Sequence, residues 1–209
     1  IRMDYFYDAN GNQIAVKLWT NASGNGRISR TYYDGLNRPI STVENLIGQN
    51  VNEPNPPAFD PANPDQNVRT DYFYDATGNQ IATKQWTALD GSGIYTRTYY
   101  DVLNRPATVI QNFVSAALTD DAPAYDPILP DQNVRTDFFY DVNGNQIASK
   151  LWKAVDGSGL ITRTYYDAFN RPVTTVQNLV GQTIDHPTPP AFNPTYPDQN
   201  VRVDSFYDA

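Results

Sequence analysis

The chain lacks residues on which many functional sites depend. Cysteine is absent and histidine occurs once among 209 residues, at His186. The absence of cysteine excludes disulfide bonds, thiolate nucleophiles and cysteine-based metal sites. A Ser-His-Asp triad would have one possible base, so we expect no catalytic, cofactor-binding or metal-binding residues. A chain without cysteine fits a bacterial or archaeal surface protein, and we expect an extracellular or cell-surface location.

Basic residues and long apolar runs are also scarce. Lys and Arg number 15 against 23 Asp and Glu, a net charge of −8. Because phosphate binding requires a basic face, we expect no nucleic-acid partner. No run of 18 apolar residues occurs and no signal peptide begins at Ile1, so we expect no membrane span.

Tyrosine is abundant, with 15 residues, and it follows a repeat. Tyr-Asp pairs recur at intervals of 67, 66 and 67 residues, at Tyr7-Asp8, Tyr74-Asp75, Tyr140-Asp141 and Tyr207-Asp208. A second series follows each of the first three by 26 residues, at Tyr33-Asp34, Tyr100-Asp101 and Tyr166-Asp167. A fixed period of this length predicts a repeat architecture whose units pack on their neighbours, and it favours a structural protein over an enzyme.

The period divides the chain into three repeats and a short remainder. Repeat 1 spans residues 1–67, repeat 2 spans 68–133, repeat 3 spans 134–200, and residues 201–209 begin a fourth. The first residues have the phase of Arg69–Asp75, and the last lie inside the next copy's first turn. We therefore expect a fragment of a longer tandem array.

Each repeat carries three turn signals of the form Asp-x-x-Gly or Asp-x-x-Asn, with Ser in place of Asp once. Asp at the first position can accept hydrogen bonds from turn amides, and the fourth position must tolerate positive φ. This frame predicts a three-residue hairpin loop, a type I turn closed by a left-handed residue in a G1 bulge. The nine frames are Asp8/Gly11, Ser23/Gly26, Asp34/Asn37, Asp75/Gly78, Asp90/Gly93, Asp101/Asn104, Asp141/Gly144, Asp156/Gly159 and Asp167/Asn170.

Between the turns, β-branched and aromatic residues alternate with polar ones. In repeat 2 this pattern predicts strands over Val68–Tyr74, Ile81–Trp86, Ile94–Tyr100 and Arg105–Val114. The expected fold is all-β: tandem repeats of antiparallel β-hairpins, about 67 residues and four strands per unit, stacked as a solenoid, spiral or tube.

Connections of about 20 residues join the repeats, over Gln49–Arg69, Ala116–Arg135 and Gln182–Arg202. They hold thirteen of the 16 prolines. Proline lacks an amide donor, so we expect extended coil across the sheet and no strands. Each connection closes on Pro-Asp-Gln-Asn-Val-Arg, which indicates a specific docked return to the sheet.

These motifs together resemble a known family. Tyr-Asp-x-x-Gly-Asn, then Asp-Gly-x-Gly, then Thr-Arg-Thr-Tyr-Tyr-Asp-x-x-Asn-Arg-Pro closely resembles the YD repeat of Rhs proteins, teneurins and Tc toxin components, over Tyr7–Val43, Tyr74–Ile110 and Tyr140–Val176. The resemblance implies a long sheet of successive hairpins, often spiralling into a hollow shell that encloses a toxin domain or forms an extracellular scaffold.

The chain departs from the family pattern in two ways. A proline-rich connection interrupts the chain after every second hairpin, and the Asp-Pro pairs at Asp60 and Asp126 lack the Gly-Leu of the family's autoproteolysis motif, so no cleavage site is carried over. Equal repeats favour a rigid filament, tube or stalk built from neighbouring repeats or identical chains. A segment of an Rhs-, Tc- or teneurin-like shell, for toxin encapsulation, adhesion or carbohydrate binding, is the alternative. Glycans and an enclosed toxin are the further partners that these alternatives would bring.

Three local patterns invite a site interpretation. His186 occupies a connection position that varies between repeats, so we expect it to be exposed. Asp8-x-Asn10-x-Asn12 resembles the start of a calcium loop, as does the same pattern at Asp141, but Gln13 and Trp19 stand where an EF-hand needs Gly and an acid. Asn21-Ala22-Ser23 matches a glycosylation sequon once, which favours a chance match.

Aromatic and basic side chains could also form a surface. A strip of aromatic residues could bind sugars, but we favour cross-strand aromatic ladders. The strip comprises Tyr72, Phe73, Tyr74, Trp86, Tyr99 and Tyr100. We expect the neighbouring basic residues to pair with turn and strand carboxylates. These are Lys84, Arg97, Lys150 and Arg163.

Overall fold

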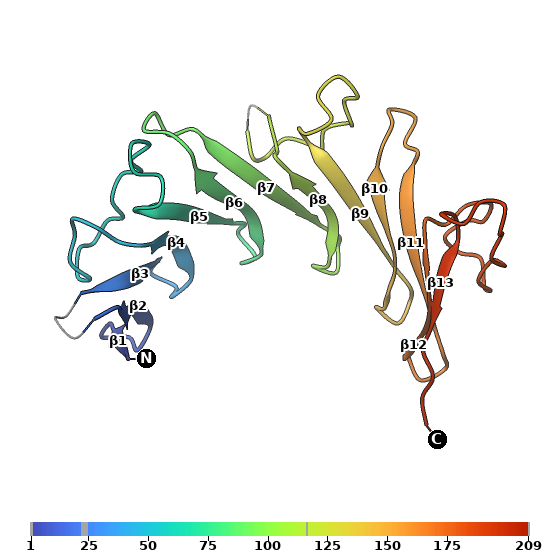
Figure 1. Ribbon diagram of the computed structural model, residues 1–209, viewed down its shortest axis with the longest axis horizontal. Helices are drawn as coiled ribbons and strands as arrows, with labels where there is room; N and C mark the ends of the chain where they lie inside the picture. The colour runs from blue at the N-terminus through green and yellow to red at the C-terminus, as the bar shows by residue number, and fades with distance from the viewer. Residues whose placement is uncertain (1, 22–24, 116, 209) are drawn as a thin grey trace. The chain divides into compact units, whose positions relative to one another are not determined.

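The computed structural model describes residues 2–21, 25–115 and 117–208, and in these ranges the chain is all-β. Thirteen strands hydrogen-bond in chain order, β1 to β13, as one open antiparallel sheet (Figure 1). The all-β prediction, with four strands in each repeat, is confirmed. No helix in these ranges is long and apolar enough to cross a membrane.

The strand bounds repeat with the sequence. Repeat 1 supplies β1 (Met3–Tyr7), β2 (Gln13–Trp19), β3 (Gly26–Tyr33) and β4 (Pro39–Glu44). Repeat 2 supplies β5 (Val68–Tyr74), β6 (Gln80–Trp86), β7 (Gly93–Tyr100) and β8 (Pro106–Gln111). Repeat 3 supplies β9 (Val134–Tyr140), β10 (Gln146–Trp152), β11 (Gly159–Tyr166) and β12 (Pro172–Gln177), and β13 (Val201–Asp204) follows.

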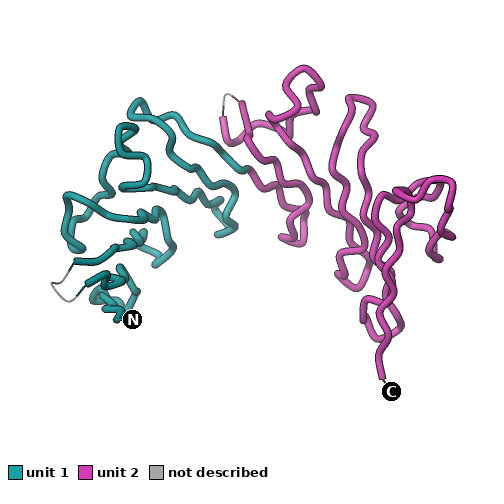
Figure 2. The backbone as a smooth tube through the Cα atoms, in the orientation of Figure 1, with its two compact units in different colours: residues 1–96 teal, residues 97–209 magenta. Residues whose placement is uncertain are grey.

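By internal contacts the chain forms two compact units, residues 1–96 and 97–209 (Figure 2). Their boundary falls inside β7. The three repeats defined by the sequence therefore do not coincide with the two compact units defined by internal contacts.

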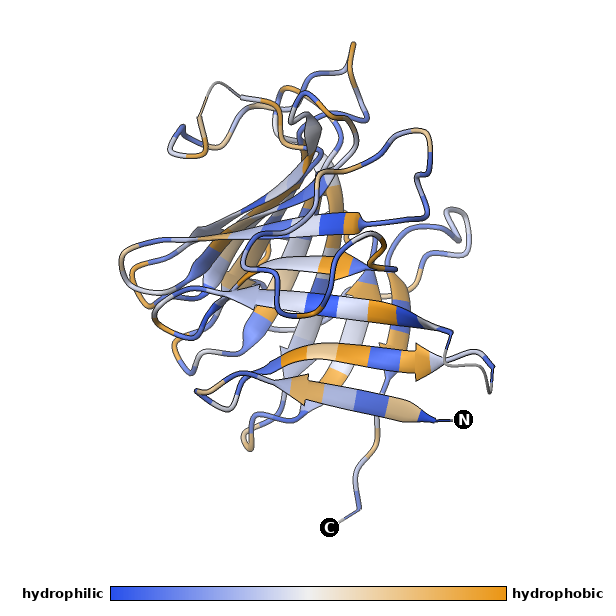
Figure 3. Cartoon of the chain, turned by 90° about the vertical axis from the view of Figure 1, so that its left-hand side faces the viewer, coloured by the Kyte–Doolittle hydropathy of each residue, from blue (hydrophilic) through white to orange (hydrophobic). Residues whose placement is uncertain are grey.

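The two faces of the sheet differ in chemistry. Directly paired residues on one face include the row Ala15, Arg30, Val43 and Arg69, and the same row recurs as Ala148, Arg163, Val176 and Arg202. The opposite face of the first unit carries a threonine row, Thr31, Thr42 and Thr70. Hydrophobic and hydrophilic residues accordingly alternate along the strands (Figure 3). The more buried face is the one with the charged residues.

Six of the nine expected turns have the predicted geometry. The fourth residue has positive φ at Gly11, Asn37, Gly78, Asn104, Gly144 and Asn170. At the first of these turns the Gly11 amide donates to the Asp8 carbonyl (3.2 Å) and the Asp8 amide to the Asn12 carbonyl (3.0 Å), and the register shifts at the strand end. This is the bulge that the Asp-x-x-Gly pattern predicts.

The Gly-Ser-Gly turns differ from the prediction. Positive φ falls on the second residue, Gly91 (φ 89°), and on its counterpart Gly157 (φ 81°), whereas Gly93 already begins β7. Glycine is needed at Gly93 for another reason: a Cβ there would lie 2.5 Å from the Gln85 carbonyl oxygen on the paired strand. The corresponding turn at Ser23 lies outside the described residues.

The fourth strand of repeat 2 ends earlier than predicted. In repeat 2 it stops at Gln111 because Asn112 takes a left-handed conformation (φ 47°) and turns the chain out of the strand. Asn45 and Asn178 do the same in the other repeats. The β-propensity of Phe113 and Val114 gave no sign of this turn.

Paired asparagines close the base of each connection. The Asn67 amide donates to the Asn45 carbonyl (3.0 Å), the Asn45 side chain donates to the Asp65 carbonyl (2.8 Å), and the Asn67 side chain accepts the Ile47 amide (2.8 Å). We call this arrangement the asparagine clasp. It recurs at Asn112 with Asn133 and at Asn178 with Asn200. The predicted docked return of the connection is confirmed.

The connections hold more structure than extended coil. In the first connection two successive turns follow Asp60, with the Asn63 amide on the Asp60 carbonyl (3.1 Å) and the Gln66 amide on the Asn63 carbonyl (2.9 Å). The expectation of simple coil is wrong here, because Asp60 caps its own turn through its side chain. The Asp-Pro pairs at Asp60 and Asp126 are turn formers.

Each connection also begins the core. Leu46, directly after Asn45, is buried with Tyr32 and Val43, and Ile28 packs on them. Leu179 lies in the same way against Tyr165 and Val176, with Ile161 and Val173 beside them. The segment that leads into the connection therefore packs on the charged face, and farther along the connection Phe59 is buried as well.

We expect Gly93→Ala to lower the free energy of unfolding by about 1–3 kcal/mol, because the added Cβ would displace the β6–β7 pairing. The matched control is Gly35→Ala. At Gly35 an added Cβ meets nothing within 4 Å and φ is not positive, so this change should stabilise by about 0.4–1 kcal/mol. Urea unfolding of both variants measures the difference, and equal effects would contradict the close-approach argument.

Candidate functional site

A cluster of Arg, Asp and Trp recurs on the charged face. In repeat 2 the Asp71 carboxylate accepts hydrogen bonds from Arg69 Nε (2.7 Å) and Trp86 Nε1 (2.7 Å). The Arg69 guanidinium lies 4.3 Å from the Trp86 ring centroid and Lys84 Nζ lies 4.0 Å from it. The same cluster forms at Arg2, Asp4 and Trp19 and at Arg135, Asp137 and Trp152.

The cluster also joins neighbouring repeats. Asp137 accepts the Thr108 hydroxyl (2.8 Å) from the last strand of the preceding repeat, and Asp204 accepts that of Thr174 (2.8 Å). Burial opposes ionisation of Asp137, but hydrogen bonds from Arg135, Thr108 and Trp152 outweigh it, so its pKa lies below the usual value. An ionised, fully engaged carboxylate holds strands together and is a poor proton donor.

The Tyr and the Asp of a Tyr-Asp pair have different roles in the structure. The Tyr74 hydroxyl donates to the Pro39 carbonyl (2.8 Å), and the Arg38 guanidinium stacks 4.6 Å from the Tyr74 ring centroid. Tyr140 and Tyr207 meet the preceding Asn-Arg-Pro segment in the same way. The Tyr of each of these pairs therefore binds the previous repeat, while the Asp builds the next turn.

The aspartates of the Tyr-Asp pairs have their oxygens engaged by the turn. Asp8 Oδ1 accepts the amides of Asn10 and Asn12 (both 2.9 Å), and Asp8 Oδ2 accepts the Asn12 side chain (2.9 Å). Asp141 has the same contacts, and hydrogen bonds lower the pKa of Asp75 to about 2, chiefly that from Thr77. Asn12 and Asn37 then link two adjacent turns (2.8 Å). The loop thus presents amide donors where a calcium site needs oxygen ligands.

The expected aromatic ladders are largely replaced by cation–π stacks. Among the described residues one ring pair is found, Phe73 with Tyr95 at 6.1 Å. Both Arg69 and Lys84 lie against the Trp86 ring, and the Tyr72 hydroxyl meets the Thr42 hydroxyl (3.1 Å). Several of these stacks join residues two positions apart, as Arg97 does with Tyr99, and others join repeats, as Arg38 does with Tyr74.

The basic residues bind carbonyl groups more than carboxylates, contrary to expectation. Lys84 donates to the Gly91 carbonyl, and Arg163 donates to the carbonyls of Ile147 (2.9 Å) and Thr164. The carboxylates of the turns pair with other arginines, as Asp34 does with Arg38 (2.8 Å). Lys150 stacks 4.8 Å from the Trp152 ring centroid.

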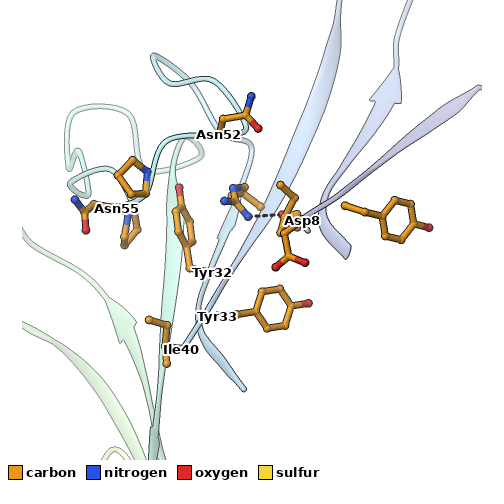
Figure 4. Close-up of a pocket in the computed structure, with 11 residues that line it drawn as sticks. Asp8, Tyr32, Tyr33, Ile40, Asn52 and Asn55 are labelled. Atoms are coloured by element: carbon orange, nitrogen blue, oxygen red, sulfur yellow. Dashed lines mark hydrogen bonds between the residues drawn. The ribbon is translucent and has the colours of Figure 1, made fainter. Parts of the chain in front are cut away.

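Two equivalent pockets lie between the sheet and a connection. The repeat-1 pocket has a volume of 380 Å³ and the repeat-3 pocket 470 Å³. The first is lined by Tyr7, Asp8, Ile14, Arg30, Tyr32, Tyr33, Ile40, Asn52, Pro54, Asn55 and Pro56. The second is lined by Tyr140, Asp141, Val142, Ile147, Arg163, Tyr165, Tyr166, Asp185 and Pro187. Figure 4 shows Tyr32 with its hydroxyl directed toward the connection that carries Asn52 and Asn55.

Each pocket contains two buried donors without a partner among the described residues. Tyr32 is 3% exposed and Arg30 8%, yet the Tyr32 hydroxyl and Arg30 Nε have no hydrogen-bond partner there. The same holds for Tyr165 and Arg163, which are 6% and 8% exposed. Buried polar atoms in native proteins are generally hydrogen-bonded, so these four covered atoms are exceptions among the residues that line the pockets. Burial also lowers the pKa of Arg30 and raises that of Tyr32.

In repeat 2 the chain itself satisfies the equivalent donors. Arg97 Nε donates to the Leu118 carbonyl (2.8 Å), and the Tyr99 hydroxyl donates to the Asp120 carbonyl (3.0 Å). Sequence reasoning missed these pockets. The signal was present, because the connection of repeat 2 is one residue shorter than the other two.

The remaining sequence candidates, His186 and Asn21, are not among the residues that line these two pockets. His186 is partly buried, where an exposed position was expected, and its Nδ1 lies 2.9 Å from the Thr188 carbonyl. Asn21 Oδ1 accepts the Asn25 amide (3.2 Å), while Ala22 and Ser23 of the sequon lie outside the described residues. In the part of the chain that the structure describes, no three His, Asp or Glu side chains form a group that could hold a metal ion.

Comparison with known proteins finds similarity only at the level of structure. No protein-family model and no curated protein matches the chain. It is similar to the Photorhabdus luminescens Tc holotoxin pore (TM-score 0.42, 16% identity), to TcdB2-TccC3 without its hypervariable C-terminal region (0.44, 20%) and to TcdB2-TccC3-Cdc42 (0.43, 15%). Each similarity covers 84% of this chain and 9% of the other, so the chain spans a small part of the length of these proteins.

We expect Asp137→Asn to lower the free energy of unfolding at pH 7 by about 2 kcal/mol through its weakened charged hydrogen bonds. Because the folded pKa of Asp137 lies below the unfolded value near 3.9, its stabilisation is present above about pH 4 and is lost as the pH falls toward the folded pKa. Urea unfolding from pH 7 to pH 2 should therefore show a flatter pH dependence in the variant. Asp131→Asn, at an exposed position, is the control and should leave the profile unchanged.

We expect Tyr99→Phe to lower the free energy of unfolding by about 1 kcal/mol, because it removes the hydrogen bond to the Asp120 carbonyl. Tyr32→Phe and Tyr165→Phe should be neutral or stabilising, because the hydroxyls they remove have no protein partner. Thermal and urea unfolding of the three variants compares the same substitution in three repeats. Equal losses would show that all three hydroxyls are satisfied in solution.

Proposed function

We propose that the chain is a structural repeat protein, a segment of a rigid filament, tube or stalk. The observation that carries this is the seam between repeats, which keeps the same strand register each time. Ser41 pairs with Asp71, Thr108 with Asp137 and Thr174 with Asp204, always as part of the same antiparallel register. Since each repeat ends in the strand that the next repeat requires, the same contacts can add units without limit.

The contacts found at each seam support a mechanical role. Each described seam has an Arg-Asp pair, a Tyr-to-carbonyl hydrogen bond and an asparagine clasp. Of these contacts the Tyr-to-carbonyl hydrogen bond crosses the repeat boundary, whereas the Arg-Asp pair and the asparagine clasp lie on either side of it. An array held in this way resists local opening, which suits a fibre exposed to proteases and to mechanical force.

A shell segment is the second candidate. The Tyr-Asp and Asn-Arg-Pro motifs that make these contacts are the ones shared with the YD repeats of Rhs, Tc and teneurin proteins. In this role the sheet would enclose a toxin domain or serve in adhesion, including carbohydrate binding. The equal spacing of the repeats favours the filament, because a closing shell gives each turn different surroundings.

The location and partners follow from this role. We propose an extracellular or cell-surface position, with neighbouring repeats or identical chains as partners and no enzymatic activity. The absence of cysteine does not fix a compartment by itself, and the net charge of −8 fits a protein without a nucleic-acid partner.

We expect electron microscopy of the native assembly to show uniform filaments with constant rise and rotation per repeat. The physical reason is the constant seam register, which transmits one fixed transformation from each repeat to the next. A closed capsule, or a spiral whose radius changes along the chain, would contradict the filament and support the shell. A chain extended by three further copies of repeat 2 gives the matched control, since its length should grow in proportion to repeat number.

A further inference from the structure

Repeat 2 shows which groups can satisfy the donors that lie beside the pockets of repeats 1 and 3. In repeat 2, the same Arg and Tyr are occupied by two main-chain carbonyl groups of the chain's own connection, at Leu118 and Asp120. A turn holds these two carbonyls in place, with the Asp120 amide on the Ala117 carbonyl (3.2 Å). The molecule therefore shows which acceptors, in which order, satisfy this pair of donors.

A single extra residue accompanies the open pockets. The turn itself is present in all three connections, through the amides of Glu53, Asp120 and His186. After it, the next aromatic residue follows six positions later at Phe59 and at Phe192, but five positions later at Tyr125. In both longer connections a proline directly follows the turn, Pro54 or Pro187, and lines the pocket. Proline fixes φ and has no amide donor, so the longer connections take another course past the donors.

The surroundings select a neutral acceptor over an anion. Asp8 lines the repeat-1 pocket, and Asp141 and Asp185 line the repeat-3 pocket. Carboxylates beside a buried arginine offset its attraction for a free anion. The remaining walls are largely the rings and aliphatic side chains of Tyr33, Ile40 and Pro56 in the repeat-1 pocket, which suit the apolar parts of a peptide.

We propose that the repeat-1 and repeat-3 pockets are peptide-binding sites, each of which takes a short turn segment of another polypeptide. Two main-chain carbonyls of that segment, two residues apart, accept hydrogen bonds from the Arg Nε and the Tyr hydroxyl once the connection shifts, because both donor atoms are buried in the free chain. Volumes of 380 and 470 Å³ lie in the range of ligand-binding pockets. Repeat 2 is the self-occupied form of the same site. This gives the array binding positions in some repeats and none in others.

The test uses the chain's own segment as the probe. A blocked peptide with the sequence of residues 117–123, Ala-Leu-Thr-Asp-Asp-Ala-Pro, is titrated into the full chain. The Nε–H signals of the protein's arginine side chains are followed by NMR. We expect saturable shifts of the Arg30 and Arg163 signals and none of Arg97, whose Nε already donates to Leu118. Tyr32→Phe should weaken binding at repeat 1 about five-fold through one lost hydrogen bond, with repeat 3 unaffected.

A graft supplies the second arm. Replacing residues 49–57 by the sequence of residues 116–123 shortens the first connection by one residue and should occupy the repeat-1 pocket. Arg30 should then lose its response to the peptide while Arg163 keeps it. The proposal is overturned if no arginine signal shifts at peptide concentrations up to about 10 mM, the weak limit for a short flexible ligand. It is also overturned if Arg97 responds equally, or if chitotetraose or inorganic phosphate shifts Arg30 and Arg163 while the peptide does not.

Discussion

The asparagine clasp at the base of each connection is the constraint on which the rest of the structure depends. A single antiparallel sheet exposes both faces, so its charged face needs a second layer, and the connection supplies it. Asn45 and Asn67, both in the left-handed region, turn the chain out of β4 and back into β5 with their backbones hydrogen-bonded. With the exit and return fixed, Leu46 reaches the core and the next strand enters in register. Without that closure each repeat would lose its cover and its link to the next.

The buried face is polar, and it remains stable because its charges are paired. Asp71 accepts hydrogen bonds from Arg69 and Trp86, and the Arg69 guanidinium also covers the Trp86 ring. Such a layer requires specific geometry, since an unpaired buried charge costs far more than a misplaced apolar contact. This explains why the Arg-x-Asp and Trp positions keep their spacing in every repeat. The oxygens of Asp71 and Asp137 already accept hydrogen bonds from the chain.

Repetition makes small differences between copies informative. The three repeats share strands, turns, seams and clasps, so one missing residue in the second connection has a visible result. There the main chain fills the place beside Arg97 and Tyr99, while Arg30 and Tyr32 face a pocket. A scaffold of equal units can therefore carry unequal binding positions without any change in its strands. Under the proposed structural role, such positions would let a uniform array recruit other polypeptides at defined intervals.

The sequence by itself determined the repeat, the all-β class, the four strands of each repeat and the Asp-x-x-Gly and Asp-x-x-Asn turns, because these depend on local conformational preference and on periodicity. It did not reveal that Gly93 serves a close approach, that Asn112 ends a strand, or that Arg163 binds carbonyls, because each depends on a neighbour distant in the chain. Which face is buried was also beyond it, since alternation defines two faces without naming the covered one. Only the tertiary structure, by laying each connection over one face, decided which polar atoms of the described residues find a hydrogen-bond partner in the chain and which do not.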